Sequence, residues 1–350
     1  MDRSVRKIEH IQHALTTNEY GFNAFDEVSF VPNSLPGVSL NSVSLQCDLG
    51  DFRLSSPIII NAMTGGAEAT TEVNRKLAVI ARERGLAMAV GSQMAALRDP
   101  SVQESYRVVR KEHPRGIVFA NVGAEATVDE AKAAVEMMEA DGLQIHLNVM
   151  QELLMPEGDR DFHGYLDHIR AISDQLEVPV MIKEVGFGMA RNTLLELMQA
   201  GVAMIDVGGR GGTNFAKVEN MRRTLPLTMF EEWGFTTVES LLEASCVRAS
   251  SAPILATGGI RHGLDAAKAM ALGASAVGIA GAMLRCVQTQ SIEECLATVD
   301  NWHYQLQVAM TALGTVQLNQ LQEQPLLITG KTAERARLRG ISLEEWAQKK

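Results

Sequence analysis

The sequence lacks the paired cysteines that mark metal sites and disulfide frameworks. Its four cysteines are scattered, and no two of them form a Cys-x-x-Cys pair: Cys47, Cys246, Cys286 and Cys295. Nothing in this spacing indicates a disulfide framework, so we expect a protein of the reducing cytoplasm.

Long apolar segments are also missing. No run reaches the roughly 18–20 apolar residues that a helix needs to span a bilayer. The first ten residues, MDRSVRKIEH, carry basic side chains, but the apolar core of a signal peptide does not follow them. These absences predict a soluble cytoplasmic protein with no membrane partner.

Acidic residues outnumber basic residues. The chain has 32 Lys and Arg residues against 42 Asp and Glu residues, a net charge of −10. A nucleic-acid surface would need a concentrated basic patch, so we expect no nucleic-acid partner. With 46% hydrophobic and 21% charged residues, the composition is that of a globular protein with ample material for a core.

Short apolar runs recur along the chain, each followed by a polar or glycine-rich turn and a helical pattern. We expect strands at residues 58–62, 87–91, 117–121, 144–148, 179–184, 204–209, 253–259 and 276–281. Gly201 and Gly273 end two of the helical stretches and suit the left-handed position beyond a helix end. Eight strand–helix units predict an α/β fold, a (β/α)8 TIM barrel.

Residues 1–350 are expected to form a single domain, because no break in composition divides the eight units. An open doubly wound sheet is the alternative, and the same continuity disfavours it. Residues 1–50 form an N-terminal extension and residues 301–350 a helical tail. The segment between the sixth and seventh strands is long, polar and interrupted, which predicts an active-site lid at residues 210–235.

Polar residues gather where the predicted strands end, which is where barrels of this kind build their sites. The first six strands finish in NAMTGG (61–66), GSQ (91–93), ANVG (120–123), HLNVMQE (146–152), KE (183–184) and DVGGRGGT (206–213). A single Ser or Thr before a helix is usually a cap. Polar ends on so many neighbouring strands are hard to explain by capping alone, so we expect a functional site there.

The last two strands end in glycines, in ATGGI (256–260) and GIAGAM (278–283). Glycine allows a ligand to approach backbone N–H groups, and the following helix N-terminus favours an anion. Either motif alone is equally well explained as a turn. Because phosphate binding after the last two strands is a habit of this barrel, the two motifs together predict a phosphate cradle.

Lys183 closes the fifth strand. Alternation places it on the same face as Met181, with Val180 and Ile182 on the other face, so it can point into the barrel mouth. A lysine there suits an electron-rich ring system or a second phosphate. The alternative is a surface lysine just beyond the strand.

The stretch QIHLNVMQELLMPEGDRDF (144–162) combines a buried strand with polar groups. His146 and Asn148 share the face opposite Ile145, Leu147 and Val149. Inside a barrel these polar groups need partners, which a substrate or cofactor would supply, although a satisfied core histidine is the simpler reading of His146 alone.

Glu152 lies beyond the same strand, with Glu157 and Asp159 nearby. A lone carboxylate that helps hold a hydrated Mg²⁺ against substrate phosphates is the usual magnesium arrangement. A helix-capping role remains the alternative for each of these acids.

The N-terminus carries the one concentration of basic residues. A helix there would place Arg3, Arg6, Lys7 and His10 on one face. Clustered Arg and Lys suit a diphosphate, although a solvated amphipathic helix is the default interpretation of such a run.

These motifs resemble those of the type 2 isopentenyl-diphosphate isomerases, a flavin-dependent family, and the likeness covers nearly the whole chain. The motifs are RKIEHI (6–11), NAMTGG (61–66), VGSQ (90–93), FANVG (119–123), residues 144–162, VPVMIKEVGFGM (178–189), DVGGRGGTNF (206–215), TGGI (257–260) and AGAM (280–283). Residues 144–162 are the most specific block, whereas many FMN barrels share the glycine motifs.

The resemblance implies a homo-oligomeric barrel, a tetramer or octamer, that holds FMN and Mg²⁺. It implies interconversion of isopentenyl and dimethylallyl diphosphate on reduced FMN, with NAD(P)H supplying the reduction but not consumed in each turnover. Moving a double bond requires one proton to be delivered and another removed at weakly acidic or basic carbons. We therefore expect the reduced cofactor to perform the transfers while the protein positions and tunes it.

Carried over position by position, the resemblance assigns FMN contacts to Ala62, Met63, Thr64, Ser92, Asn121, Lys183, Thr213, Gly258, Gly259, Ala280 and Gly281. The diphosphate would meet Arg6, Lys7 and His10, and the substrate would lie along His146, Asn148 and Gln151. Glu152 would hold the metal. Catalysis would fall to Gln151, His146 and Lys183, and Arg210 has no assigned role.

Three rival functions differ in the residues they need. An FMN-dependent 2-hydroxy-acid oxidase needs a histidine base beside an arginine, yet no histidine occurs between His168 and His262. A nucleotide dehydrogenase would need a loop cysteine, and none occurs between Cys47 and Cys246. A non-catalytic flavin- or phosphate-binding module would not need both a metal-binding carboxylate such as Glu152 and the basic residues of the N-terminus.

Overall fold

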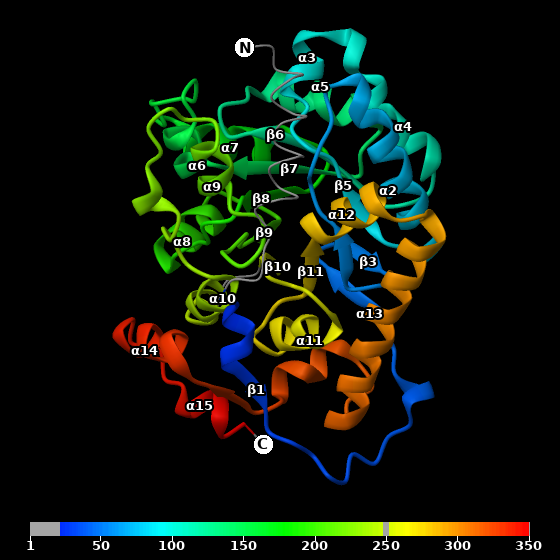
Figure 1. The fold of residues 1–350 in the computed structure, drawn as a ribbon, viewed down its shortest axis with the longest axis vertical. Helices are drawn as coiled ribbons and strands as arrows, with labels where there is room; N and C mark the ends of the chain where they lie inside the picture. The colour runs from blue at the N-terminus through cyan, green and yellow to red at the C-terminus, as the bar shows by residue number, and fades with distance from the viewer. Residues whose placement is uncertain (1–21, 248–251, 350) are drawn as a thin grey trace.

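Parallel strands close into a barrel in the computed structural model, which describes residues 22–247 and 252–349 (Figure 1). The order around the barrel is β10-β11-β4-β5-β6-β7-β8-β9. The barrel strands are β4 (Ile58–Ile60), β5 (Ala87–Ala89), β6 (Val118–Gly123), β7 (Gly142–Leu147), β8 (Val180–Glu184), β9 (Met204–Asp206), β10 (Ile254–Thr257) and β11 (Ala276–Ile279). Each overlaps a strand predicted from the sequence, and the predicted α/β (β/α)8 class is confirmed.

Helices connect the strands and surround the barrel (Figure 1). They are α2 (Thr71–Arg84), α3 (Met94–Arg98), α4 (Glu104–Glu112), α5 (Val128–Met138), α6 (Val149–Leu154), α7 (Tyr165–Gln175), α8 (Arg191–Gln199), α9 (Phe215–Asn220), α10 (Thr237–Ser245), α11 (Gly263–Ala271), α12 (Gly281–Thr289), α13 (Ile292–Leu313), α14 (Gly330–Leu338) and α15 (Glu344–Ala347). Short 3-10 helices add η1 (Ala24–Glu27), η2 (Leu40–Ser42), η3 (Glu68–Thr70), η4 (Pro100–Val102), η5 (Thr228–Phe230) and η6 (Leu318–Glu323).

Local sequence signals set the limits of several helices. α5 starts with a capping box, in which Thr127 accepts from the backbone N–H of Glu130 and the Glu130 side chain accepts from that of Thr127. Gly201 and Gly273 follow α8 and α11 with φ of +81° and +109°, as predicted for the left-handed position beyond a helix end.

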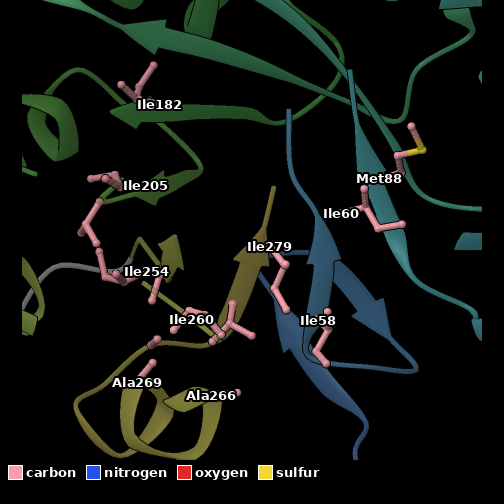
Figure 2. Packing of buried hydrophobic residues seen from close by; sticks show 14 of the residues in the cluster. Ile58, Ile60, Met88, Ile182, Ile205, Ile254, Ile260, Ala266, Ala269 and Ile279 are labelled. Carbon is pink, nitrogen blue, oxygen red and sulfur yellow. The ribbon is translucent and has the colours of Figure 1, made fainter. Parts of the chain in front are cut away.

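Alternating side chains divide the apolar core into two parts. Outward-facing residues of the strands pack against the helices, and Figure 2 shows Ile58, Ile60 and Met88 among them, with Ile260 close to α11. Inward-facing residues fill the barrel as a separate cluster that includes Ile59, Met181, Met204 and Leu255. This alternation follows from the two faces of a strand, and it fixes which side chains can reach the barrel mouth.

A hairpin closes the end of the barrel where the strands begin. Its strands β2 (Cys47–Leu49) and β3 (Phe52–Leu54) pair in antiparallel fashion. Leu49 and Leu54 join the inward-facing cluster, and the ring of Phe52 meets that of Phe119 edge-on at 5.3 Å. Because apolar side chains block this end, a polar ligand can enter only at the opposite rim.

Segments from both ends of the chain meet outside the barrel (Figure 1). β1 (Val28–Phe30) pairs with β12 (Leu326–Ile328), so the tail that was expected to be helical also contributes a strand. Among residues 22–247 and 252–349, none of the helices combines the length and the apolar character that crossing a membrane requires.

One cysteine pair departs from the expectation based on cysteine spacing. Cys286 of α12 and Cys295 of α13 form a disulfide, with their Cα atoms 5.7 Å apart. The spacing of the cysteines does not indicate this pairing, which depends on how α12 and α13 pack against each other. Cys47 and Cys246 are free cysteines.

Candidate active site

A polar layer lies above the apolar filling of the barrel, where the parallel strands end. Gln144 and Asp206 are fully buried there, and Asn61, Asn121 and Lys183 are at most 6% exposed. Burying so many polar groups is costly unless each is hydrogen-bonded. This layer forms the floor of the candidate site.

Amide side chains link one half of this layer. Gln144 donates from Nε2 to Asn61 Oδ1 at 2.9 Å, and Asn121 donates from Nδ2 to Gln144 Oε1 at 3.3 Å. His146 Nδ1 lies 3.0 Å from Asn121 Oδ1, which makes Nδ1 the protonated nitrogen because an amide oxygen only accepts. Asn121 and His146, which were predicted separately as cofactor and substrate residues, are therefore in direct contact.

A buried carboxylate holds the other half of the layer. Asp206 Oδ2 accepts from Asn61 Nδ2 at 2.6 Å and from Thr257 Oγ1 at 2.9 Å, while Oδ1 accepts from the Gly208 N–H at 3.1 Å. Burial raises the pKa of Asp206, against the opposing effects of the Lys183 charge and of these donors. Sequence reasoning missed Asp206, although it is the first residue of the DVGGRGGT motif.

Lys183 lies at the end of β8, beside Asp206 in the strand register. It is 6% exposed, and its neighbour Met181 on the same strand face belongs to the inward-facing cluster. Its Nζ donates to the backbone carbonyl of Glu184 at 2.9 Å. Lys183 is thus part of the polar layer and not a surface lysine.

Glu184 is the last residue of β8, and its side chain is hydrogen-bonded to the backbone of the turn that follows. Its Oε2 accepts from the Gly186 N–H at 2.6 Å and also from the Phe187 N–H. Burial raises the pKa of Glu184 to about 7, although these N–H groups and the Lys183 charge act in the opposite direction.

The glycines after β10 and β11 form a surface of backbone N–H groups. β10 and β11 are hydrogen-bonded neighbours. Gly258 has φ of +107°, and a Cβ there would lie 2.0 Å from the carbonyl oxygen of Gly209, so only glycine fits. α12 begins at Gly281 after Ala280, and no described side chain caps its first turn. Uncapped N–H groups beside a glycine loop are the donor set that a phosphate group requires.

Predicted cofactor residues after β4 and β5 lie in neighbouring loops. Ala62, Met63 and Thr64 follow Asn61, and the Thr64 carbonyl accepts from the Gly91 N–H at 2.9 Å, next to Ser92. Two residues outside the motifs hold these loops: Asn74 donates to the Thr64 carbonyl at 3.2 Å, and the Tyr106 hydroxyl donates to the Ser92 carbonyl at 2.5 Å.

The strand that carries His146 ends earlier than expected. β7 stops at Leu147, and α6 begins at Val149, so the predicted alternation through Val149 is wrong at its last step. Val149 is 38% exposed on the helix. Asn148 occupies the position before the helix and donates from Nδ2 to Glu152 Oε1 at 2.8 Å.

Gln151 is held by an acid that sequence reasoning missed. Gln151 is 8% exposed and donates from Nε2 to Oε1 of Glu219, which is fully buried on α9, at 2.9 Å. Arg222 Nη1 donates to the other oxygen of Glu219 at 2.7 Å. Because a carboxylate only accepts, this contact fixes the amide group of Gln151 and turns its own oxygen away from Glu219. α6 and α9 lie side by side in Figure 1.

Acidic side chains surround Glu152. Its second oxygen, Oε2, accepts from the Asp159 N–H at 2.9 Å. Desolvation, together with the charges of Glu152 and Asp159, raises the pKa of Glu125, whose side chain folds back over Gly123. No group of three or more His, Cys, Asp or Glu side chains able to hold a metal occurs within the described part of the chain. Glu152 is a single carboxylate of the kind that a hydrated ion with few protein ligands would use.

The segment between β9 and α10 covers one side of the mouth. Thr213 lies in it, and its carbonyl faces Gly186. Arg210 forms an ion pair with Glu232 and donates from Nη1 to the Glu232 carbonyl at 2.7 Å. Arg210 thus ties the two ends of this segment together, a role that the motif alone did not reveal.

The predicted diphosphate residues Arg6, Lys7 and His10 lie outside the described residues. The chain that follows them is fastened to the glycine loop. Asn23 is 4% exposed and donates from Nδ2 to the Gly259 carbonyl at 2.7 Å.

Known structures share this barrel. A mandelate oxidase mutant with a monooxide FMN adduct aligns with a TM-score of 0.63 at 17% identity, covering 91% of this chain and 92% of that one. A putative lactate oxidase of Pediococcus acidilactici aligns with a TM-score of 0.66 at 15% identity, covering 92% of this chain and 87% of that one. At these identities the likeness establishes the fold alone. The model of the FMN-dependent dehydrogenase family matches residues 100–328, which defines the class as an FMN-dependent barrel family.

Sequence relatives are more specific. The isopentenyl-diphosphate delta-isomerase of Geobacillus sp. (strain WCH70) is 52% identical over 333 residues, 95% of each chain. The isomerases of Bacillus licheniformis and Bacillus cytotoxicus are both 49% identical to this chain. The first alignment covers 97% of this chain and 98% of the relative, and the second covers 100% of each. This chain belongs to the type 2 isopentenyl-diphosphate delta-isomerases.

Proposed function

We propose that this enzyme interconverts isopentenyl and dimethylallyl diphosphate on reduced FMN in isoprenoid biosynthesis. Its relatives at about 50% identity over the full chain are isopentenyl-diphosphate delta-isomerases, and the family match is to FMN-dependent proteins. NAD(P)H supplies the reducing equivalents, and the enzyme works in the cytoplasm as a homo-oligomer, a tetramer or octamer.

The residues of the mouth fit FMN. The glycine loop at Gly258 and Gly259, with the uncapped start of α12, offers backbone donors to the phosphate. Lys183 offers a buried ammonium group to the ring. Ala62, Met63, Thr64, Ser92, Asn121, Thr213, Ala280 and Gly281 complete the proposed cofactor contacts. When bound and reduced, the flavin supplies a titratable nitrogen and an electron-rich ring beside the alkene.

The observation that carries the proposal is the link between Gln151 and Glu219. A buried carboxylate fixes one side of a buried amide at 2.9 Å, so the amide oxygen has a defined direction. In our account Gln151 orients or relays a proton at the reacting carbon, since an amide is a poor acid by itself. His146 and Asn148 line the substrate, and the Asn121 contact orients the His146 ring.

The diphosphate is anchored at two places. Glu152, which lies beside Asp159 and Glu125, would hold Mg²⁺, and the ion would offset the negative charge of the diphosphate. Arg6, Lys7 and His10 provide the cationic contacts. Pinning the charged end places the alkene in a near-attack position and removes much of the entropic barrier.

Residues 210–235 act as a lid within a single domain of residues 1–350. The ion pair between Arg210 and Glu232 supports this role, because it lets the segment move as one unit. The lid exposes large apolar side chains: Leu225 is 79%, Met229 70% and Trp233 55% exposed. Closure over substrate or contact with another subunit would bury such a surface.

A direct assay tests the proposal. Purified protein is loaded with FMN, reduced anaerobically with dithionite, and given Mg²⁺ and isopentenyl diphosphate. We expect dimethylallyl diphosphate to accumulate, and none to form with oxidised flavin. Bleaching of the flavin by lactate or glycolate would instead identify a 2-hydroxy-acid oxidase, and flavin binding without any turnover would indicate a binding module.

A further inference from the structure

Asp206 is a buried ionisable group that has no role in the proposed chemistry. Its side chain is fully buried at the end of β9, where the strand register sets it beside Lys183 of β8. An ionisable group is rarely buried this completely without a partner or a function.

We propose that Asp206 is a positioning residue that provides the counter-charge to Lys183 and thereby sets the reduction potential of the bound flavin. This inference rests on the proposed binding of FMN at the barrel mouth. It does not require that the substrate be isopentenyl diphosphate.

Donors from different parts of the rim hold the carboxylate in place. Asn61, directly after β4, and Thr257 of β10 donate to Oδ2 at 2.6 and 2.9 Å, and the Gly208 N–H donates to Oδ1 at 3.1 Å. Both oxygens are engaged, so the side chain cannot rotate away. Donors of this kind stabilise the charged form of a carboxylate, which opposes the effect of burial.

The neighbouring strand leaves room for this arrangement. A Cβ atom added to Gly278 of β11 would lie 2.1 Å from Thr257 Oγ1 and 2.8 Å from Asn61 Nδ2. Any other residue at this position would push apart the two donors that hold Asp206. Gly278 therefore preserves the contact between Asp206 and its donors.

The expected effect on the flavin follows from the charges. Two-electron reduction with uptake of one proton gives the reduced ring one negative charge more than the oxidised ring. Lys183 stabilises that added charge, and Asp206 opposes it. Because charges interact more strongly in a buried layer than in water, loss of the Asp206 charge should make the flavin easier to reduce.

Three variants of the full-length, FMN-loaded protein separate this role from a structural one. Asp206→Asn removes the charge and keeps the size. Thr257→Val keeps Asp206 and removes one of its donors. Glu243→Gln is the control, because Glu243 is 1% exposed and ion-paired with Arg339, directly after α14, so the substitution removes a buried charge outside the mouth.

The midpoint potential is measured by anaerobic dithionite titration against a reference dye. We expect Asp206→Asn to shift the flavin toward the reduced form by tenfold or more, about 30 mV for a two-electron couple. Thr257→Val should shift it in the same direction by less, because a carboxylate that loses a donor is partly protonated. Glu243→Gln should keep the wild-type potential.

An Asp206→Asn protein that binds FMN at the wild-type potential, or at a more negative one, overturns the proposal. If that variant does not fold, Thr257→Val decides, and an unchanged potential there overturns it equally. Wild-type protein that cannot bind FMN refutes both this inference and the proposed function. The predicted shifts without any isomerase activity would refute the proposed function and support the role of Asp206.

Discussion

Gln151 and Glu219 lie 68 positions apart in the chain, and the Nε2 atom of the amide is 2.9 Å from a carboxylate oxygen of the acid. The contact joins α6, which follows β7, to α9, which lies in the lid segment after β9. The contact thus connects Gln151, a proposed substrate residue, to α9, which belongs to the proposed lid. If residues 210–235 close over the site as proposed, this bond would link their closure to the orientation of Gln151.

Weakening the hydrogen bond between Gln151 and Glu219 should lower the turnover rate more than it weakens substrate binding. Glu219→Gln replaces a carboxylate that only accepts with an amide that can present either its oxygen or its NH₂ group, so Gln151 is no longer held in one orientation. We expect kcat to fall by about 100-fold, the lower end of what a positioned proton-transfer group contributes, with little change in KM. Initial rates with isopentenyl diphosphate measure both constants.

Glu157→Gln is the matched control, because Glu157 also contacts Arg222 but not Gln151. It should retain near-wild-type kcat. Gln151→Ala should lose turnover without losing FMN affinity, and the double variant with Glu219→Gln should be no slower than Gln151→Ala. Additive losses would show that the two residues act separately.

Glu152→Gln should raise the Mg²⁺ concentration needed for half-maximal activity. The amide keeps the size of the side chain but loses the charge that attracts a hard cation. Asp159→Asn is the comparison, because Asp159 meets Glu152 through its backbone N–H. An unchanged metal requirement in Glu152→Gln would remove Glu152 as the ligand.

The glycine loop gives a prediction on cofactor affinity. Gly258→Ala puts a Cβ 2.0 Å from the Gly209 carbonyl at φ of +107°, so the loop must shift. We expect FMN affinity to fall by about tenfold or more, since such backbone strain costs about 1–3 kcal/mol. Gly201→Ala also has positive φ, but nothing lies within 4 Å of its Cβ, so FMN titration of that variant should give the wild-type affinity.

Glu184 makes stability depend on pH. Its pKa is about 7 in the folded protein against an ordinary value of 4.5, so the folded state binds its proton more tightly than the unfolded state does. The contribution of Glu184 to the free energy of unfolding is therefore greatest at low pH and is lost as pH rises through about 7.

Glu184→Gln removes this titration. Compared with wild type, the variant should gain on the order of 3 kcal/mol of unfolding free energy between about pH 5 and pH 8. Denaturant unfolding of both proteins across that range gives the difference. A constant difference would mean that Glu184 stays charged in the folded protein.

The barrel and its rim could be predicted from the sequence because both follow from local patterns. Each apolar run with its following helix is a short-range signal, and the carboxyl ends of parallel strands must meet at one rim. The same reasoning predicts that His146, Asn121 and Lys183 meet at this rim. It also predicts that Gly258 and Gly281 follow neighbouring strands, as they do in the structure.

The remaining features depend on packing between distant segments. Nothing near Gln151 indicates that Glu219 holds it, and the pairing of β1 with β12 joins opposite ends of the chain. The alternation of its neighbours predicts that Asn148 is a strand residue, yet it lies at the start of α6 and its side chain donates to Glu152. Contacts between side chains that are distant in the chain produce no periodic pattern in the sequence.

In the proposed reaction, isomerisation of bound isopentenyl diphosphate requires the flavin in its reduced form but does not consume it. The most direct measurement of this central claim follows reduced, Mg²⁺-loaded enzyme with isopentenyl diphosphate in D₂O, anaerobically, by NMR and flavin absorbance together. We predict many turnovers of deuterium-labelled dimethylallyl diphosphate per flavin while the absorbance stays that of the reduced form. Absence of the isomer, or oxidation of one flavin for each product molecule formed, would contradict the claim.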